Sequence, residues 1–356
     1  MIRDPSRLES LDAEHVALVA SRHSATPEVA RRLLGHLSLG SRVLVAMSGG
    51  ADSTALTAIL LALHRRRSPS TIEPVVGHVD HGLRSTSAEE AACVEEVASR
   101  LGLESLTHRL DWAGHDGRIS SDDARQARWS ALDEMAESAG AVAILTAHHA
   151  EDQAETVLMR LARGTGMTGL AGIPEVRSTV GGRLVIRPLL QRSRGELVDL
   201  VHAARLPWID DPTNADRGRS RERLRHDVLP ILEEIHPGAA RHLAALAEEC
   251  AAVPDSSPVT SPASARIDRA QVRGWSDAAV VTRLREVASR TIGRPMRSVP
   301  RDVWRRAAAM VVDLEPRPRR LRIDAGLEIV VHRDHATFER TEPSTSASTT
   351  PAPPTP

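Results

Sequence analysis

One stretch of this sequence decides its fold: Val43-Leu44-Val45-Ala46-Met47-Ser48-Gly49-Gly50-Ala51-Asp52-Ser53-Thr54. It begins with an apolar run of the kind that forms a buried parallel strand. A Ser-Gly-Gly turn breaks the run, and residues 53–60 then take up helical spacing. A strand, a glycine turn and a helix start together expose several backbone N–H groups at a positive helix end. The stretch therefore predicts an anion-binding site.

Phosphate is the anion that suits this turn. Paired glycines let the main chain approach phosphate oxygens without a Cβ in the way. Ser48, Asp52 and Ser53 add hydroxyl and carboxylate groups to the same turn. The alternative is an ordinary turn between a strand and a helix that binds no ligand, since a Gly-Gly pair occurs in many such turns. The chain contains no lysine, so the P-loop pattern with its Gly-Lys pair is excluded.

Strands and helices alternate along the first 215 residues. The first strand and helix are followed by strands expected at 74–79, 106–110, 141–146 and 184–186, and by helices expected at 89–101, 121–139, 150–162 and 194–204. This alternation predicts an α/β fold with a doubly wound parallel sheet, covered by helices on both faces. Ligands bind beyond the carboxyl ends of such strands, so the glycine turn, Asp80-His81 and His148-His149 should converge on one crevice.

The chain divides into three parts. Residues 1–215 are expected to form an α/β domain around the phosphate-binding turn. Residues 216–340 are expected to form a smaller, mostly helical domain that ends in a hairpin, and the Ser/Thr/Pro-rich tail 341–356 should be disordered. Charge differs between the halves, with 23 arginines against 29 acidic residues in 1–216 and 23 against 17 in 217–340. A basic second half fits the binding of a polyanion, or is simply a solvated face.

The composition excludes several classes of protein. The two cysteines, Cys93 and Cys250, are far apart and give neither a disulfide framework nor a zinc site. No apolar run approaches the length of a membrane span, and residues 1–5 lack the features of a signal peptide. We therefore expect a cytoplasmic protein without a membrane partner. The oligomeric state is left open, with a homodimer as one arrangement.

A second polar cluster lies where the fourth strand ends and the next helix begins. Asp152 and Glu155 are three residues apart, so both carboxylates share one helix face. Three interpretations compete. In the first, His149 and Asp152 are two ligands of a metal site. In the second, the two acidic residues only favour the positive end of the helix. In the third, the two carboxylates neutralise an ammonium group on a small substrate.

The glycine turn resembles the Ser-Gly-Gly-x-Asp-Ser loop of the PP-loop ATP pyrophosphatases, with their adenine nucleotide alpha-hydrolase-like fold. Further motifs follow in one order, and from about residue 40 to 235 the series resembles the tRNA(Ile)-lysidine synthetases. These motifs are Val79-Asp80-His81-Gly82-Leu83-Arg84, Ala124-Arg125-Gln126-Ala127-Arg128-Trp129, His148-His149-x-x-Asp152-Gln153-x-Glu155-Thr156, Arg160-x-x-Arg163-Gly164-Thr165-Gly166, Ile186-Arg187-Pro188-Leu189-Leu190, Arg194-Gly195-Glu196-Leu197 and Trp208-Ile209-Asp210-Asp211-Pro212-Thr213-Asn214.

The resemblance implies a two-step reaction at cytidine 34 of a tRNA(Ile) with the anticodon CAU. ATP first adenylates the C2 oxygen of the base, and the amine of free L-lysine then displaces AMP. It makes residues 1–215 the PP-loop ATP-binding catalytic domain and residues 216–340 a basic tRNA-binding domain. The resemblance also implies a catalytic set of Asp52, Asp152 and Glu155. The implied ATP-binding residues are Ser48, Gly49, Gly50, Ala51, Asp52, Ser53 and, more weakly, Arg128. Asp52 is the candidate ligand of Mg²⁺, and the implied lysine-binding residues are Asp152, Glu155 and Arg221.

An arginine cluster follows the last of these motifs. We expect four of its members, Arg217, Arg219, Arg223 and Arg225, to contact tRNA phosphates, although a solvated helix face is the alternative. The sequence departs from the family here, because Glu222 stands where the family usually has Asn. That difference puts the assignment of the neighbouring Arg221 in doubt.

Other functions remain to be weighed. A PP-loop tRNA thiolase needs reactive cysteines or an iron–sulfur cluster, and two distant cysteines supply neither. A glutamine-dependent amidotransferase needs an ammonia-generating domain, for which the chain has no motif. An NAD synthetase fits the glycine turn but not the basic second half. A catalytically inactive RNA-binding relative is the rival from another class.

Overall fold

The chain forms two compact units, one of residues 1–159 and 170–252 and the other of residues 160–169 and 253–356. The computed structural model describes residues 2–3, 6–65, 72–82, 86–112, 119–209, 220–252, 266–272, 275, 277–293, 296, 299–313, 318–324 and 326–341. The expected boundary at 215 differs from this division, because residues 220–252 belong to the first unit. Leu229 and Ala240 pack there in one small core with Ala154. The expected disordered tail, apart from Thr341, lies outside the described residues.

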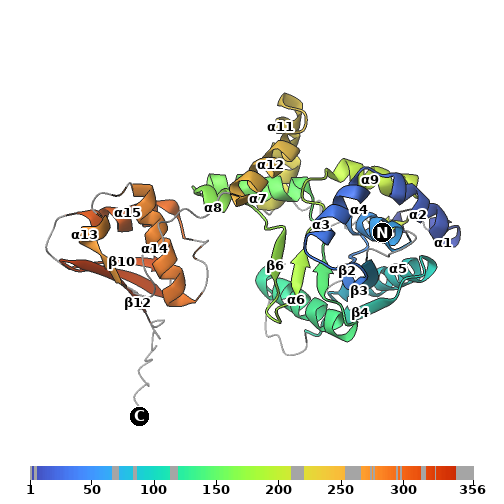
Figure 1. The fold of residues 1–356 in the computed structure, drawn as a ribbon, viewed down its shortest axis with the longest axis horizontal. Coiled ribbons are helices and arrows are strands. Elements are labelled where there is room, and N and C mark those ends of the chain that lie inside the picture. The colour runs from blue at the N-terminus through green and yellow to red at the C-terminus, as the bar shows by residue number, and fades with distance from the viewer. Residues whose placement is uncertain are drawn as a thin grey trace, which may run out of the picture. The chain divides into compact units, whose positions relative to one another are not determined.

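A six-stranded sheet organises the first unit (Figure 1). Its strands, in spatial order, are β4 (Ser105–Arg109), β3 (Ile72–Asp80), β2 (Ser41–Ala46), β5 (Ala143–Leu145), β7 (Leu184–Ile186) and β6 (Val176–Ser178). All neighbours pair in parallel except β6 and β7. The predicted parallel sheet is therefore confirmed, with one antiparallel edge strand added to it.

Helices cover both faces of this sheet, as predicted. They are α2 (Ala13–Arg22), α3 (Ala25–Leu34), α4 (Ala51–His64), α5 (Ser87–Arg100) and α9 (Arg194–Ala203) on one face and α6 (Ser121–Ser138) on the other. Alternation along β2 shows why. Val43 and Val45 belong to the core beneath the first set, whereas Leu44 and Ala46 pack with Leu132 of α6.

Smaller elements complete the first unit. They are α1 (Ser6–Glu9), α7 (Ala150–Ala162), α10 (Ser220–Arg223), a π-helical turn η2 (Leu224–Val228), α11 (Leu229–Ile235), α12 (Ala239–Ala252) and the short pair of β1 (Ile2–Arg3) with β8 (Trp208–Ile209). The backbone N–H of Ile209 donates to the carbonyl of Gly49 at 2.8 Å. Strand β8 thus braces the glycine turn. Helix α8 (Met167–Leu170) follows α7 along the chain.

The second unit has its own core and its own sheet. Antiparallel strands pair in the order β10-β11-β12-β9, and the predicted hairpin is the β11–β12 pair. Fully buried Trp304 lies near Phe338 in this core, with ring centroids 6.5 Å apart. The elements are β9 (Arg266–Asp268), α13 (Arg269–Val272), α14 (Asp277–Ile292), α15 (Arg301–Val312), β10 (Arg319–Asp324), β11 (Leu327–Val331) and β12 (His335–Arg340). Among the described residues of the chain, no helix is both long and apolar enough to span a membrane.

Candidate active site at the carboxyl edge of the sheet

The turn after β2 is held open by its own hydroxyl groups. Ser53 Oγ accepts the N–H of Ser48 at 3.1 Å and donates to the carbonyl of Gly50 at 3.0 Å. Helix α4 begins with Gly50 as its N-cap, and no side chain caps it. The first N–H groups of α4 therefore remain available at the positive end of a buried helix, which is the geometry that binds phosphate.

Gly49 gives this turn its shape. Its φ of +83° lies in the left-handed region that favours glycine. A Cβ placed there would come within 2.6 Å of Ile209 Cδ1 and 3.2 Å of Val94 Cγ2. The close packing and the backbone conformation both require glycine, so the chain folds locally as the sequence predicts.

The predicted acidic pair meets two arginines. Arg221 donates from Nη2 to Asp152 Oδ1 at 3.0 Å and from Nε to Glu155 Oε2 at 2.5 Å. Arg225 makes the matching contacts, from Nη2 to Asp152 at 3.2 Å and from Nε to Glu155 Oε1 at 2.7 Å. Glu155 is fully buried. Its negative charge is therefore balanced entirely by guanidinium groups that come from α10 and η2.

His149 joins the acidic pair to the glycine turn. Its Nε2 lies 3.4 Å from Asp152 Oδ2 and 3.7 Å from Asp52 Oδ2, and its Nδ1 lies 2.9 Å from Glu151. The ring is 3% exposed, and burial acts to lower the pKa of the imidazole. The three carboxylates outweigh burial and raise that pKa, which favours the charged ring. This contact confirms that two of the three predicted regions, the glycine turn and the His148-His149 segment, meet in one crevice. Asp80 of the third region instead accepts the N–H of Gly82 at 2.8 Å and lies 3.7 Å from Arg109.

Asp52 has the features of a cation ligand. Its Oδ1 is buried and has no hydrogen-bond partner among the described residues, while Oδ2 lies 3.8 Å from Arg194 Nε. Burial, more than any neighbouring charge, raises the pKa of the Asp52 carboxyl. The described residues contain no group of three or more side chains placed to hold a metal ion. Mg²⁺ commonly takes one or two protein carboxylates together with phosphate oxygens and water, so a single orphaned carboxylate fits it.

His148 also lies beside the acidic pair, but its ring, unlike that of His149, is uncharged. Its Nδ1 is 2.9 Å from Thr146 Oγ1. Burial is the main reason that the pKa of His148 falls to about 3, and the positive charges of Arg187, Arg128 and Arg221 add to it. The ring is therefore neutral in the folded protein near neutral pH.

The neutral state of His148 makes stability depend on pH. Unfolded His148 takes up a proton near its ordinary pKa of 6.5, whereas the folded ring does so only near 3, so the free energy of unfolding should fall as pH drops below about 6.5. Replacing His148→Gln should remove this part of the slope in urea denaturation measured at a series of pH values. His36→Gln, a change at an exposed position, should leave the slope intact. An unchanged slope in the His148 variant would contradict the assigned charge state.

The structure brings most of the predicted site residues together. The glycine turn, Asp152, Glu155 and Arg221 share one crevice, and Arg128 acts electrostatically on His148. Glu222 lies 3.7 Å from the ring of His226 and does not disturb Arg221. The four arginines predicted to contact tRNA phosphates do not form one group in the structure. Arg217 and Arg219 lie outside the described residues, Arg223 is 72% exposed and lies 4.0 Å from Asp227, and Arg225 binds the acidic pair.

The sequence patterns alone do not predict that His149 contacts Asp52 or that Arg225 pairs with the acidic residues. His149 belongs to the motif that was singled out, and only its spacing from Asp152 marked it. Arg225 follows Arg221 by four residues, a spacing that places both on one side of a helical segment. That spacing could have suggested a paired role.

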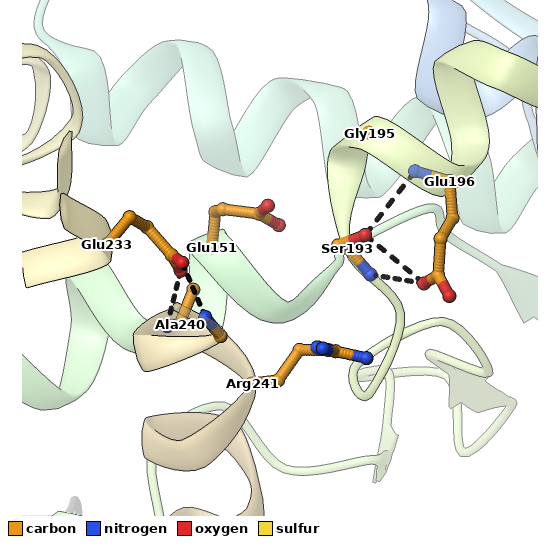
Figure 2. A pocket seen from close by; sticks show the side chains of 8 residues that line it. Glu151, Ser193, Gly195, Glu196, Glu233, Ala240 and Arg241 are labelled. Atoms are coloured by element: carbon orange, nitrogen blue, oxygen red, sulfur yellow. Dashed lines mark hydrogen bonds between the residues drawn. The ribbon is translucent and has the colours of Figure 1, made fainter. Parts of the chain in front are cut away.

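An open pocket of about 360 Å³ adjoins the acidic pair through Glu151, and Figure 2 shows its lining residues. Its three carboxylates already serve helix ends. Glu196 and Ser193 form the capping box of α9, Glu151 accepts the N–H of Arg194, and Glu233 accepts N–H groups at the start of α12. Replacing these contacts would uncap the helices. The pocket is therefore a poorer receptor for an ammonium group than Asp152 and Glu155, whose partners are exchangeable side chains.

A parallel sheet with a phosphate-binding Ser-Gly-Gly turn and an acidic helix start beside it defines the PP-loop class, and the model of the PP-loop domain matches residues 25–232. A tRNA(Ile)-lysidine synthase of Salinispora tropica is 38% identical over 300 residues, which cover 83% of this chain and 86% of that protein. The chain belongs to the tRNA(Ile)-lysidine synthase family.

One further relative agrees with this assignment, and one solved structure agrees with the fold. A tRNA(Ile)-lysidine synthase of Methylobacterium sp. (strain 4-46) is 46% identical over 233 residues, and the chain spans 65% of its length. The solved structure of the U34-tRNA thiolase NcsA from Methanococcus maripaludis has a TM-score of 0.55 at 17% identity, over 65% of this chain and 78% of that one. The second similarity concerns the fold alone.

Proposed function

We propose that this protein ligates free L-lysine to C2 of cytidine 34 in a CAU-anticodon tRNA(Ile), with ATP as the activating substrate. The contact of His149 with both Asp52 and Asp152 carries the proposal. It links a phosphate-binding turn to a receptor for an amine within one crevice. An enzyme that first adenylates a base and then attacks it with an amine needs these two sites in this relation.

The first step would activate the base. The C2 oxygen of cytidine attacks the α-phosphorus of ATP, a P–O bond forms, and pyrophosphate leaves with the electrons of the broken bond. The free N–H groups at the start of α4 would hold the phosphates, and Asp52 would hold Mg²⁺. Bound Mg²⁺ would neutralise charge on the phosphate oxygens. Arg128 remains a proposed phosphate contact.

The second step would transfer the amine. The lysine nitrogen attacks C2, the C–O bond to AMP breaks, and the nitrogen loses a proton. Asp152 would accept that proton or orient the amine, because a carboxylate within hydrogen-bond reach of a bound amine can do either. The charges of His149 and the arginines outweigh burial and lower the pKa of Asp152, which keeps this group ionised.

Lysine binding would exchange one set of ion pairs for another. Arg221 and Arg225 neutralise Asp152 and Glu155 in the absence of substrate. An incoming ammonium group would replace a guanidinium on these carboxylates. A displaced arginine fork then matches the carboxylate of the same lysine, so each group that loses its ion-pair partner gains another.

The proposed RNA contacts come from the arginines of the segment 217–225. Arg217, Arg219 and Arg223 remain candidates for tRNA phosphates, whereas the position of Arg225 favours a role at the acidic pair. We place the reaction in the cytoplasm, where tRNA is modified. A homodimer remains a separate proposal that the reaction does not require.

The decisive experiment supplies isotopically labelled lysine together with ATP, Mg²⁺ and a CAU-anticodon tRNA. We expect mass analysis to find the label on cytidine 34. We also expect pyrophosphate release to require both ATP and the CAU-anticodon tRNA. Equal release with an unrelated tRNA would contradict the proposed substrate. Sulfur in place of lysine would indicate a thiolase, and tRNA binding without any pyrophosphate would indicate an inactive relative.

A further inference from the structure

Four arginines gather on the side of the crevice away from the glycine turn. This arginine cluster consists of Arg125 and Arg128 on α6, Arg177 on β6, and Arg187 directly after β7. Strand β7 is two positions from β2 in the sheet, so about 10 Å separates the two strands at the usual strand spacing. The cluster is therefore a different place from the phosphate-binding turn.

Buried Arg187 is its least expected member. The residue is 2% exposed, its Nη1 donates to the carbonyl of Pro174 at 2.7 Å, and its Nε is buried without a partner in the described part of the chain. No carboxylate lies within ion-pair distance of Arg187 in that part. A buried guanidinium that only a carbonyl satisfies is costly to fold, unless it serves an anion that binds later.

Two of the other arginines, Arg177 and Arg125, lie close enough to Arg187 for their charges to act on it, and Arg128 lies close to Arg125. Arg177 pairs with Val185 across β6 and β7, and its guanidinium lies 4.0 Å from the ring centroid of Trp129. Trp129 follows Arg125 by four residues on α6, so these two side chains share a helix face. Within the described residues, Arg125 and Arg128 likewise have no acidic partner.

The pKa values of these arginines agree with a cluster of like charges. Burial lowers the pKa of Arg187 to about 10, with further contributions from Arg177 and Arg125. Burial and then Arg125 also lower the pKa values of Arg128 and Arg177. The four groups therefore repel one another, and a bound anion would relieve that repulsion.

We propose that the arginine cluster is a second phosphate site, in which Arg125, Arg177 and Arg187 bind a backbone phosphate of the RNA beside the base that is modified, while Arg128 keeps its proposed contact with ATP. Two features favour RNA over the tail of ATP as the source. The cluster stands apart from the glycine turn, and the partly exposed guanidinium of Arg177, held over the ring of Trp129, is a planar group of the kind on which proteins seat unpaired bases. The identity of the RNA rests on the proposed function, whereas the phosphate chemistry does not.

The test uses the full chain with Arg125→Gln and Arg177→Gln, singly and together. Arg31→Gln, an exposed helical arginine on α3, is the matched control. Binding of a CAU anticodon stem-loop RNA is measured over a range of salt without ATP. We expect about a tenfold loss of affinity for each variant and a shallower salt dependence, by about 0.7 per lost phosphate contact. The Michaelis constant for ATP should stay at the wild-type value.

The outcomes separate the two sources of phosphate. A raised ATP requirement, with inhibition by pyrophosphate weakened and RNA binding unchanged, would assign the cluster to the nucleotide tail instead. Variants that match the control in both measurements would overturn the phosphate site even if the wild type makes lysidine. If the wild type makes no lysidine but the variants lose RNA affinity, the proposed reaction fails and the phosphate site stands.

Discussion

Replacing Asp152→Asn should raise the Michaelis constant for lysine by about 100-fold while that for ATP changes little. The carboxylate is 14% exposed and shares its charge among Arg221, Arg225 and His149. A neutral amide keeps the shape but loses the charged partner that an ammonium group needs, and a hydrogen bond to a charged group contributes about 1.5–3 kcal/mol. Steady-state kinetics with each substrate varied in turn measures the split.

Asp133→Asn is the matched control for this prediction. Asp133 is also a carboxylate paired with an arginine, with Oδ1 2.6 Å from Arg183 Nη1, but it lies on α6 away from the acidic pair. Its amide variant should leave the lysine requirement unchanged. Equal increases in the constants for lysine and ATP in the Asp152 variant would remove amine binding from this carboxylate.

Replacing Gly49→Ala should destabilise the first unit by about 2–4 kcal/mol and abolish pyrophosphate release. A side chain in the left-handed region costs about 1–2 kcal/mol, and forcing a Cβ against buried Ile209 and Val94 costs about as much again or more. Movement of the loop to relieve the contact would also move the N–H groups that are proposed to hold phosphate. Urea denaturation measures the first effect and a pyrophosphate assay the second.

The neighbouring glycine supplies the control. Gly50 has a φ of −69°, and a Cβ there would meet nothing closer than Ser48 Oγ at 3.6 Å. Gly50→Ala should therefore cost little stability, even though it lies in the same turn. Equal losses of stability in the two variants would show that the turn tolerates no side chain at all, and that the left-handed conformation of Gly49 is not the cause.

The pattern of the sequence predicted much of the fold correctly. Alternation of strands and helices predicted β2 to β5, β7 and the helices between them, because a buried parallel strand and an amphipathic helix each leave a local periodic signature. Strand β6 has three residues and turns back antiparallel, so it left no such signature. The domain boundary also differed. The helices from 220 to 252 bury Leu229 and Ala240 with Ala154 of α7.

Local sequence specifies the glycine turn, the strand before it and the acidic helix start, since each depends on residues that are neighbours along the chain. Which charges meet depends on the packing of distant segments. Arg225 reaches Glu155 across 70 residues of sequence, and His149 reaches Asp52 because β2 and β5 are neighbours in the sheet. Periodicity shows which face of its own element a residue occupies. The partners across that face depend on strand order and helix packing, which no local pattern records.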